Sequence, residues 1–560
     1  MLGHLTVLFS VATLLAPFLS VLSMFLFLKQ HKKNVYKISI FFSYFALITS
    51  FVMLTLFFNN HKHIYIFRDT LFSLYITPLS VMLMAFVSTV SLVIHTYSIK
   101  YMYDEEGYIR FFILLDLMIG TIFAITIFSN LLMLALFWHL IGVILYFQLI
   151  HNYTKKQSYK FGFYTFFTHL LSDIPLIMAV VLIYKYYNTL DLKLFLDILP
   201  HHNINLNMLG THWSLASIIA TLIVLSAIIK SAGFPFHIWL PFTLEGPTPI
   251  SALMHAGIVN AGAFLTNRFA PIFLQGDSAL YLMLIIGFIT AIIGSSSMLM
   301  QNDIKKALAY STVGQMGYMM LEVGSGAFAL AIYHMMVHGI FKASLFLGSG
   351  SIINEARNNP NIADRSIFDF FFSKANHKKP SFIEYALFTM ILPMVITFYI
   401  FFSNSKTNLL ESGILFYLFA WVSGAQTIYT MYKTHKRFKA IFLTFFGFGI
   451  SLCVYLAMEH FFGTILFFDR ELPKKLLEAA SWNKIDFYII YGVITCIILA
   501  TWIFKYQDLV YHKSIYLKFR SIYAFVYKIF SREFYILDIS SNIAKKMIAF
   551  SKSINMKLRY

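Results

Sequence analysis

Apolar stretches of about 20 residues recur along the whole length of this 560-residue chain, and each is long enough to cross the hydrocarbon core of a bilayer. Hydrophobic residues make up 59% of the sequence and charged residues only 12%, about half the charged share of soluble proteins. Lipid offers no hydrogen-bond partner to the backbone, so such segments must cross it as helices. We therefore predict an all-α polytopic membrane protein with about 15 transmembrane helices. The predicted spans lie near residues 5–28, 36–58, 71–98, 111–129, 130–150, 162–185, 213–233, 248–274, 279–300, 304–324, 326–350, 382–402, 413–433, 440–461 and 486–506.

The net charge of +18 does not indicate a nucleic-acid partner, because the basic residues gather in short loops between the predicted spans. Nearly all of these basic loops follow odd-numbered spans, so they lie on one side of the membrane. By the positive-inside rule that side is the cytoplasm, which predicts an N-terminus outside the cell and a C-terminus inside it. The basic loop 469–484, on the opposite side, is an exception.

The sequence carries no signature of bond chemistry. Cys453 and Cys496 each lie within an apolar run, so they form neither a disulfide framework nor a metal site. There is no P-loop and no dinucleotide-binding glycine motif. We therefore expect a chain that moves ions, with no cofactor of its own. The tail 507–560 alternates aromatic residues with Lys and Arg, a pattern typical of an amphipathic helix on an anionic membrane surface.

One segment interrupts the apolar pattern in an informative way. Lys230 closes the span 213–233, and Gly233 and Pro235 follow at once, which should break the helix. A lysine held in a low-dielectric site loses basicity, so it can exchange its proton near neutral pH and act as a relay. Alternatively, a lysine at a helix end extends its ammonium to the membrane surface. Glu245, in the same segment, either pairs with Lys230 or lies in a surface loop.

Histidines follow in two later spans. His255 lies about two turns into the span 248–274, where it is either a structural residue or a relay. His334, His338 and Lys342 follow one another at intervals of four residues, which places them on one face of the span 326–350. Such a face must meet protein or water, and its groups can pass protons. Two histidines at this spacing also suit zinc, but no further ligand nearby in the sequence completes the site.

Other ionisable residues extend this set. Asp303 and Lys306 stand at the start of the span 304–324, where Asp303 is placed to cap the helix or to take part in proton movement. Ionisable residues at membrane depth are costly and therefore indicate function. Those within spans four to six, which we expect to join a polar axis through the bundle, are Asp116, His139, His169 and Asp173.

Four segments together resemble the proton-translocating antiporter-like family of membrane subunits. They are 230–241 (KSAGFPFHIWLP), 246–255 (GPTPISALMH), 303–318 (DIKKALAYSTVGQMGY) and 334–347 (HMMVHGIFKASLFL). The family includes subunit 5 (L) of respiratory complex I, the large Mrp antiporter subunit, and DabB, the membrane subunit of inorganic carbon transporters. The resemblance covers about residues 70–350, and the segment 256–265 followed by Arg268 is most similar to DabB.

The resemblance implies two inverted five-helix repeats with broken helices in the seventh and twelfth spans. The expected organisation is N-terminal helices in 1–110, a first repeat in 111–274, a second in 275–433, C-terminal helices in 434–506 and a cytoplasmic amphipathic tail in 507–560. The proton pathway that it implies consists of Lys230, Glu245, His255, Asp303, Lys306, His334, His338, Lys342, His139 and Asp173.

Two positions depart from the complex I pattern. His139 follows Trp138 where complex I subunits carry a glutamate, and the twelfth span has Pro393 but no lysine. These differences favour a DabB-like subunit in the plasma membrane, driven by protons or Na⁺. It would energise a DabA-like, zinc-containing cytoplasmic partner that captures CO2 as bicarbonate, and the zinc would belong to that partner. The two other hypotheses are a proton-pumping subunit L/5 of NADH–quinone oxidoreductase and a subunit of an Mrp-type Na⁺/H⁺ antiporter.

Overall fold

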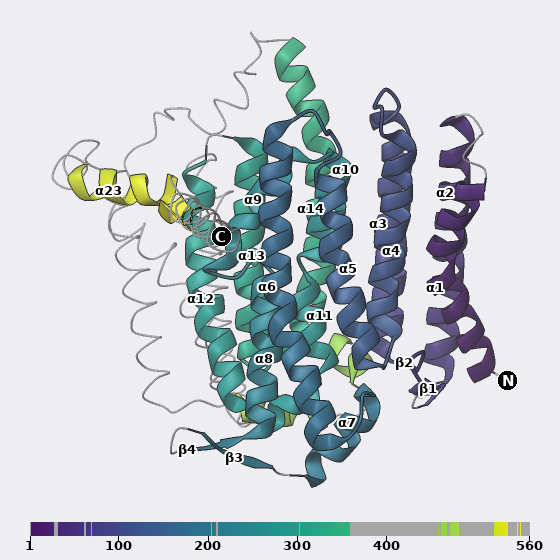
Figure 1. Cartoon of the computed structure of the whole chain (residues 1–560), viewed down its shortest axis with the longest axis vertical. Helices are drawn as coiled ribbons and strands as arrows, with labels where there is room; N and C mark the ends of the chain where they lie inside the picture. Colours follow the sequence, from purple (N-terminus) through teal and green to yellow (C-terminus); the bar gives the residue numbers. More distant parts are fainter. Residues whose placement is uncertain are drawn as a thin grey trace, which may run out of the picture.

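The computed structural model describes most of residues 2–358 and a few later segments. The gaps are 27–31, 61–62, 69, 203, 209–210 and 302, and the later described segments are 457–458, 461–467, 471–480, 520–531 and 533–535, with the single residues 546 and 549. Long helices running roughly side by side dominate the described part (Figure 1). They are α1 (Leu2–Leu26), α2 (Lys32–Asn60), α3 (Pro78–Tyr101), α4 (Tyr108–Ile127), α5 (Leu131–Leu149), α6 (Lys156–Tyr187), α8 (Leu215–Lys230), α12 (Asp277–Leu299), α13 (Ile304–Gly324) and α14 (Phe328–Asn358).

The helices match a polytopic membrane protein. Within the described residues, nine helical segments are long and apolar enough to cross a membrane, and α8 is a shorter apolar helix. Each predicted span from 5–28 to 326–350 coincides with a helix, which confirms the fold class. The remaining predicted spans, the second break near Pro393 and the total of about 15 lie outside the described residues.

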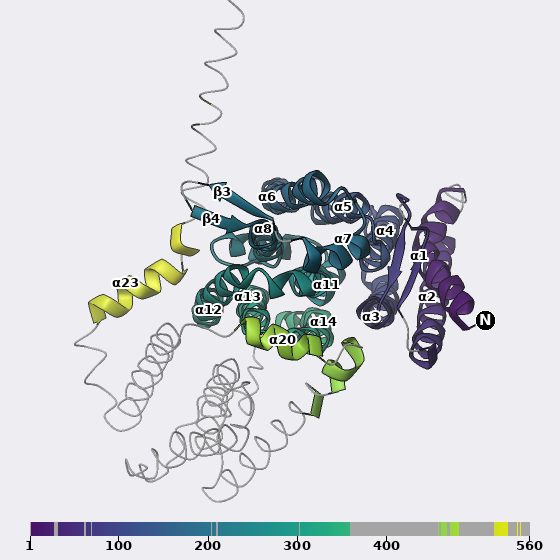
Figure 2. The same ribbon diagram turned by 90° about the horizontal axis from the view of Figure 1, so that it is seen from below.

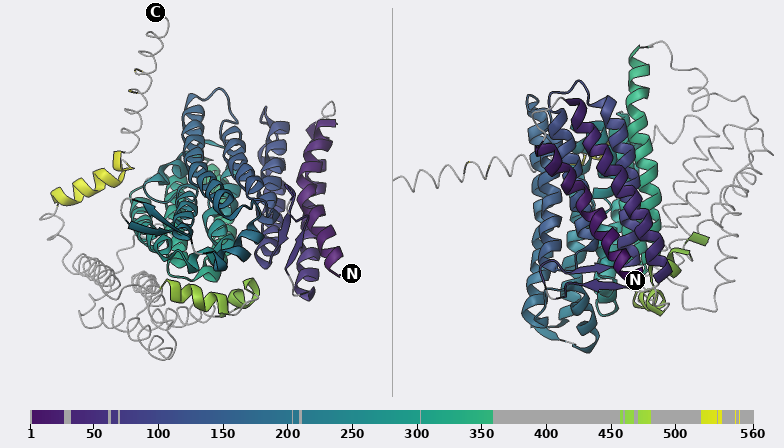
Figure 3. Two further views of the ribbon diagram at one scale, coloured as in Figure 1. Left: turned by 60° about the horizontal axis from the view of Figure 1, so that its bottom comes forward. Right: turned by 90° about the vertical axis from the view of Figure 1, so that its right-hand side faces the viewer.

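The arrangement is seen most clearly along the helix axes (Figure 2). The α1–α2 hairpin lies at one edge, followed by α3 and α4, and the other helices form the main body. Two later helices lie against this body. The helix α20 (Glu471–Ala479) packs on η5 (Ala270–Leu274), and the amphipathic helix α23 (Arg520–Ser531) contacts α12 (Figure 3). Finding α23 within 507–560 agrees with the amphipathic helix predicted there.

Small elements at the helix ends were not predicted. β1 (Ile64–Ile66) pairs with β2 (Leu74–Ile76), and β3 (Asn205–Met208) pairs with β4 (Thr211–Ser214), both antiparallel. The short helix α7 (Leu192–Ile198) and the turn η1 (Leu199–His201) precede β3. The span predicted from residue 71 is therefore wrong at its start. The helix begins at Pro78, because Thr77 caps it by accepting the Ser80 N–H and the apolar residues before it form β2.

The predicted boundary between the spans 111–129 and 130–150 is confirmed at Ser129 and Asn130. Asn130 caps α5 by accepting the N–H groups of Leu132 and Met133, at 3.0 and 3.3 Å. The Ser129 hydroxyl donates to Asp191, which itself caps α7. These two caps fix the ends of α4 and α5 on the same side of the molecule as β1 and β2 (Figure 1).

The predicted helix break after Lys230 is also confirmed. Ala232 takes a left-handed backbone conformation (φ 53°), so the helix cannot continue through it. Short helical pieces follow in place of a continuous span: η2 (Phe236–Ile238), α9 (Trp239–Phe242), η3 (Thr243–Glu245) and α10 (Thr248–Leu253). A π-helical turn, η4 (Met254–Ile258), then precedes α11 (Ala261–Arg268), and this interruption was not predicted. Such turns often mark functional sites.

Candidate functional site

Lys230 is the last residue of α8, and its side chain is completely buried. Its ammonium group donates to the Trp138 carbonyl oxygen at 2.7 Å and to Asp173 Oδ1 at 3.4 Å. It also lies 4.9 Å from the centre of the Trp138 ring, within the range of a cation–π contact. The lysine therefore faces the protein interior, and the alternative in which it extends to the membrane surface does not describe this structure.

Asp173, on α6, links Lys230 to a second base. Its other oxygen, Oδ2, lies 2.7 Å from His139 Nδ1, so one carboxylate contacts two bases. Asp173 is buried, whereas 37% of the His139 side chain is exposed. The chain His139–Asp173–Lys230 thus leads from the periphery of the described part to its interior. Asp173 occupies the place expected for Glu245, which ends η3 and whose side chain lies outside the described part.

Three neighbouring helices hold this chain in place. Trp138 Nε1 on α5 donates to the Ser172 hydroxyl on α6 at 3.2 Å, and that hydroxyl donates to the Ser226 carbonyl on α8 at 2.9 Å. Gly142 allows α5 to approach α6 closely, because a Cβ atom at this position would lie 2.9 Å from His169 Cβ. Helices in membranes pack closely at such small residues.

Two buried histidines lie around the broken helix. His169, one turn before Asp173, packs edge-on against Trp239 with ring centres 4.6 Å apart, and His237 lies in η2. Neither ring nitrogen of His169 has a hydrogen-bond partner within the described residues, whereas the backbone of Pro235 lies beside the His237 ring. Buried polar groups are nearly always hydrogen-bonded. The His169 ring, which lies within electrostatic range of Lys230, is therefore placed to bond a water molecule there.

A second cluster occupies the face of α14 that the spacing predicted. His334 Nδ1 lies 2.7 Å from Glu322 Oε1, and its Nε2 lies 2.8 Å from Gln315 Oε1, both on α13. Lys342 donates to the Leu308 carbonyl at 3.1 Å and to the Ser311 hydroxyl. The predicted face therefore packs against α13, inside the protein.

His338 and His255 complete this second cluster. Both are buried, and within the described residues neither has a hydrogen-bond partner for its ring nitrogens. The His255 ring stacks on Phe346, with ring centres 4.2 Å apart. His338 lies within electrostatic range of His255, His334 and Lys342. The π-helical turn η4 carries His255 toward α14, so residues from two separate predicted spans meet here.

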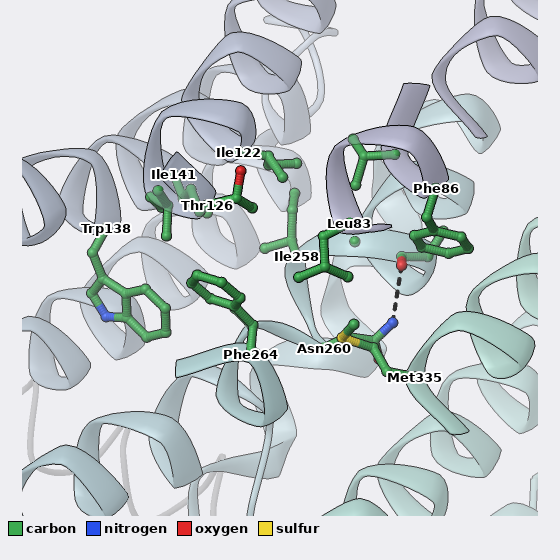
Figure 4. Close-up of a pocket in the computed structure, with 15 residues that line it drawn as sticks. Leu83, Phe86, Ile122, Thr126, Trp138, Ile141, Ile258, Asn260, Phe264 and Met335 are labelled. Carbon is green, nitrogen blue, oxygen red and sulfur yellow. Dashed lines mark hydrogen bonds between the residues drawn. The ribbon is translucent and has the colours of Figure 1, made fainter. Parts of the chain in front are cut away.

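An apolar cavity is lined by residues that adjoin each of the two clusters (Figure 4). Trp138, which contacts Lys230, lines one side of it, and Met335, beside His334, lines another. Asn260 also lines the cavity and donates to the Ala256 carbonyl at 2.9 Å within the η4 region. No sequence pattern indicated this cavity, because its lining residues come from several helices.

Asp303 and Lys306 lie at the start of α13. The Asp303 carboxylate accepts the Lys306 N–H at 2.9 Å, the geometry of a helix cap. The neighbouring Lys305 reaches the broken-helix region, where its ammonium group donates to the Thr248 hydroxyl at 3.2 Å. Asp116 lies in a separate cluster with His95, away from the axis on which it was expected.

Comparisons with known proteins agree with this architecture. Residues 128–423 match the family described as NADH:quinone oxidoreductase/Mrp antiporter, TM, and residues 69–112 match the N-terminus of complex I chain 5. A similar protein is the "Probable inorganic carbon transporter subunit DabB1" of Halothiobacillus neapolitanus. It is 38% identical over 87% of this chain and 88% of its own length. The chloroplast NAD(P)H-quinone oxidoreductase subunit 5 of Piper cenocladum is also 38% identical, over 50% of this chain and 38% of its own.

Solved structures share the fold. The Mrp complex from Dietzia sp. DQ12-45-1b matches with a TM-score of 0.58 and 17% identity, over 91% of this chain and 57% of that one. An archaeal membrane-bound sulfane sulfur reductase matches with a TM-score of 0.53 and 15% identity, over 90% and 94% of the two chains. The predicted resemblance is thus confirmed: the chain belongs to the NADH:quinone oxidoreductase/Mrp antiporter family of cation-translocating membrane subunits.

Proposed function

We propose that this chain is the proton-conducting membrane subunit of an inorganic carbon transporter in the plasma membrane. The observation that carries proton conduction is the chain His139–Asp173–Lys230, which leads from a partly exposed histidine to a buried lysine at the end of a broken helix. Ionisable groups at membrane depth are retained where they move ions. In transporters, ion sites form beside broken helices.

The geometry suggests how a proton moves within the first cluster. Asp173 offers one oxygen to each base, so its negative charge stabilises a positive charge on either His139 or Lys230. When one base gains a proton, it shares the negative charge of Asp173, and the electrostatic attraction between Asp173 and the other base becomes weaker. His139, which is partly exposed, would exchange protons with the periphery, and Lys230 would pass them inward.

The second cluster continues the proposed route. His255, His338 and Lys342 are buried groups that can each bind and release a proton, and His334 sits between Glu322 and Gln315. The apolar cavity between the clusters interrupts the route, because dry apolar space does not carry protons (Figure 4). We propose that transient entry of water into this cavity connects Lys230 to His255.

Full-length similarity supports inorganic carbon as the transported substrate. The match to the carbon transporter subunit runs over 88% of that protein, whereas the chloroplast subunit 5 is matched over 38%. In this proposal the chain energises a DabA-like cytoplasmic partner, which would hold the zinc and convert CO2 to bicarbonate. His139 remains partly exposed although ionisable groups avoid lipid. Its side of α5 and α6 is therefore a suitable face for water.

Co-purification tests the proposal against its two alternatives. The tagged chain should bring down one large subunit that contains zinc, and deleting the gene should prevent growth in ambient air but not at raised CO2. Recovery of flavin and iron–sulfur subunits, with lowered NADH-linked respiration, would instead identify the chain as an NADH–quinone oxidoreductase subunit. Recovery of several small membrane subunits with salt-sensitive growth would support an Mrp-type antiporter.

A further inference from the structure

A second buried acid–base pair lies in the N-terminal helices, apart from Lys230. Asp116 on α4 points Oδ1 at His95 Nε2 on α3, at 2.8 Å. Its Oδ2 accepts hydrogen bonds from Ser20 on α1 at 2.7 Å and from Ser39 on α2 at 2.8 Å. His95, Ser20 and Ser39 are completely buried, and Asp116 is 3% exposed. One carboxylate thus joins four helices at a point closed to the surface.

The contacts of His95 fix how many protons the pair holds. Its Nδ1 lies 2.7 Å from the Ser91 carbonyl oxygen, which can only accept, so Nδ1 carries a hydrogen. If Nε2 were bare, its lone pair would face an ionised Asp116 oxygen at 2.8 Å, an arrangement without a hydrogen bond. A further proton therefore lies between Nε2 and Oδ1. The pair is a carboxylate with an imidazolium, or a carboxylic acid with a neutral imidazole.

Within the described residues, the groups that contact the pair are uncharged, so none of them replaces the shared proton as the positive partner of the carboxylate. Among the described contacts of the pair, α1 and α2 contribute serine hydroxyls, α3 contributes Ser91, and α4 contributes Phe112, whose ring lies 6.1 Å from that of His95. A neutral amide in place of Asp116 would join the same four helices without burying an ionisable group, so joining helices alone does not account for this choice.

Buried hydroxyls continue from the pair along the α1–α2 interface. Ser43, one turn from Ser39 on α2, is buried, and its hydroxyl has no hydrogen-bond partner in the described part of the chain. Farther along, the Thr13 hydroxyl of α1 donates to the Thr49 hydroxyl of α2 at 2.9 Å. A hydroxyl can accept a proton on one side while it gives up its own on the other. These hydroxyls mark a direction in which the pair can exchange its proton once Ser43 turns to bond its neighbours, since no hydrogen bond within the described residues joins it to Ser39.

We propose that His95 and Asp116 form a second proton-binding site, which exchanges its proton through the hydroxyls between α1 and α2. For release, the shared proton stays on the Asp116 carboxyl group, which turns to present it to the Ser39 oxygen, while Ser39 turns its own hydrogen away from Oδ2 and passes it onward. The pair is left as a carboxylate beside a neutral imidazole. Since those two atoms then repel each other, release also weakens the tie between α3 and α4. The site depends on its own contacts and not on the route through Lys230.

Asp116→Asn is the decisive variant because it preserves the hydrogen bonds. The asparagine carbonyl can accept from Ser20 and Ser39, and its amide can donate to a neutral His95 Nε2, so the helices stay joined while the shared proton is removed. Infrared difference spectra of the purified complex, taken across a pH titration, would report carboxyl protonation. We expect a titrating signal from aspartate and histidine in the wild type that Asp116→Asn lacks at normal complex yield. Transport should fall at least about 100-fold, the lower range for loss of a positioned proton-transfer group.

Controls separate this site from general effects and from the Lys230 route. Asp197→Asn removes an exposed carboxylate paired with Lys193 and should change neither readout. Lys230→Ala should stop transport yet leave the Asp116 infrared signal. A failure of the proposed route through Lys230 can therefore be told apart from a failure of the His95–Asp116 proposal. If Asp116→Asn fails to assemble, Ser20→Ala decides, because losing one donor to Oδ2 must move the pH at which the signal appears. Normal transport and an unchanged infrared titration in the variant that assembles would overturn the proposal. The His95–Asp116 contact would then serve only to join the helices.

Discussion

Replacing Asp173 by asparagine tests the central feature of the first cluster. The change keeps the shape of the side chain but removes the charge that faces Lys230 at 3.4 Å. At an effective dielectric constant of about 20, two unit charges at this separation attract by about 5 kcal/mol. Measured losses on removing one partner of a buried ion pair, about 3–5 kcal/mol, are of the same size. Most of this attraction should therefore be lost in the variant, in which Lys230 has no carboxylate beside it.

The assay is proton movement into proteoliposomes that contain the purified complex, followed with a pH-sensitive dye. We expect Asp173→Asn to assemble normally and to lose at least about 100-fold in rate, because Lys230 can no longer alternate between proton-bound and proton-free states. Asp173→Glu should recover part of the rate, since it restores a carboxylate between the two bases. Asp197→Asn, at an exposed ion pair, is the matched control. A rate within a factor of about two of wild type in Asp173→Asn would refute the charge-pair argument, because the pair contributes far more than that.

Four further predictions follow from the same structure. Lys230→Ala should abolish transport with normal assembly of the complex, as measured in the same proteoliposomes; full activity would remove Lys230 from the route. Gly142→Leu should separate α5 from α6 and lower the free energy of unfolding by about 1–3 kcal/mol, because the Cβ atom of the new side chain alone would lie 2.9 Å from His169 Cβ. Ile122→Trp should fill the cavity of Figure 4 and slow transport without loss of complex, and an unchanged rate would place the cavity off the route. Burial, and then the nearby Arg110, lower the pKa of His151 in the α5–α6 loop to about 4. Between pH 6.5 and 4 only the unfolded state therefore gains this proton, and the free energy of unfolding falls as the pH falls. His151→Gln should reduce the pH dependence of the melting temperature across that window.

The sequence predicted the helices well because span length and apolar composition are local properties. It failed at the start of α3, where Leu74–Ile76 is as apolar as the helix that follows and only Thr77–Pro78 marks the boundary. The face formed by His334, His338 and Lys342 was predictable from spacing alone, and the structure places it against α13. The π-helical turn η4 has no such signal, since Met254–Ile258 reads as part of an ordinary apolar helix.

The partner of Lys230 shows why tertiary contacts limit such prediction. Asp173 and His139 lie 34 residues apart and Lys230 lies 57 residues beyond Asp173, so only the packing of α5, α6 and α8 brings them together. The sequence identified all three residues as ionisable groups inside spans, but it could not assign the pairs. Asp116 shows the opposite outcome. It was grouped with the same axis, and the structure places it against His95, in the helices α3 and α4 that lie between α5 and the α1–α2 hairpin (Figure 1).

The buried acids within the described spanning helices share one arrangement. This arrangement explains how the first cluster works with His139 in the position where complex I subunits carry a glutamate. Asp116, Asp173 and Glu322 each face a histidine, at 2.8, 2.7 and 2.7 Å. A carboxylate and an imidazole that hold one proton between them are neutral as a pair, which reduces the penalty of burying either group. Histidine also exchanges its proton near neutral pH more readily than lysine. The first cluster therefore has an acid, Asp173, although His139 stands where complex I subunits carry a glutamate. His139 extends the Asp173–Lys230 pair into a relay of three groups. If this is correct, His139→Glu should leave Asp173 beside a second carboxylate and slow transport, whereas faster transport would show that the complex I arrangement also suits this chain.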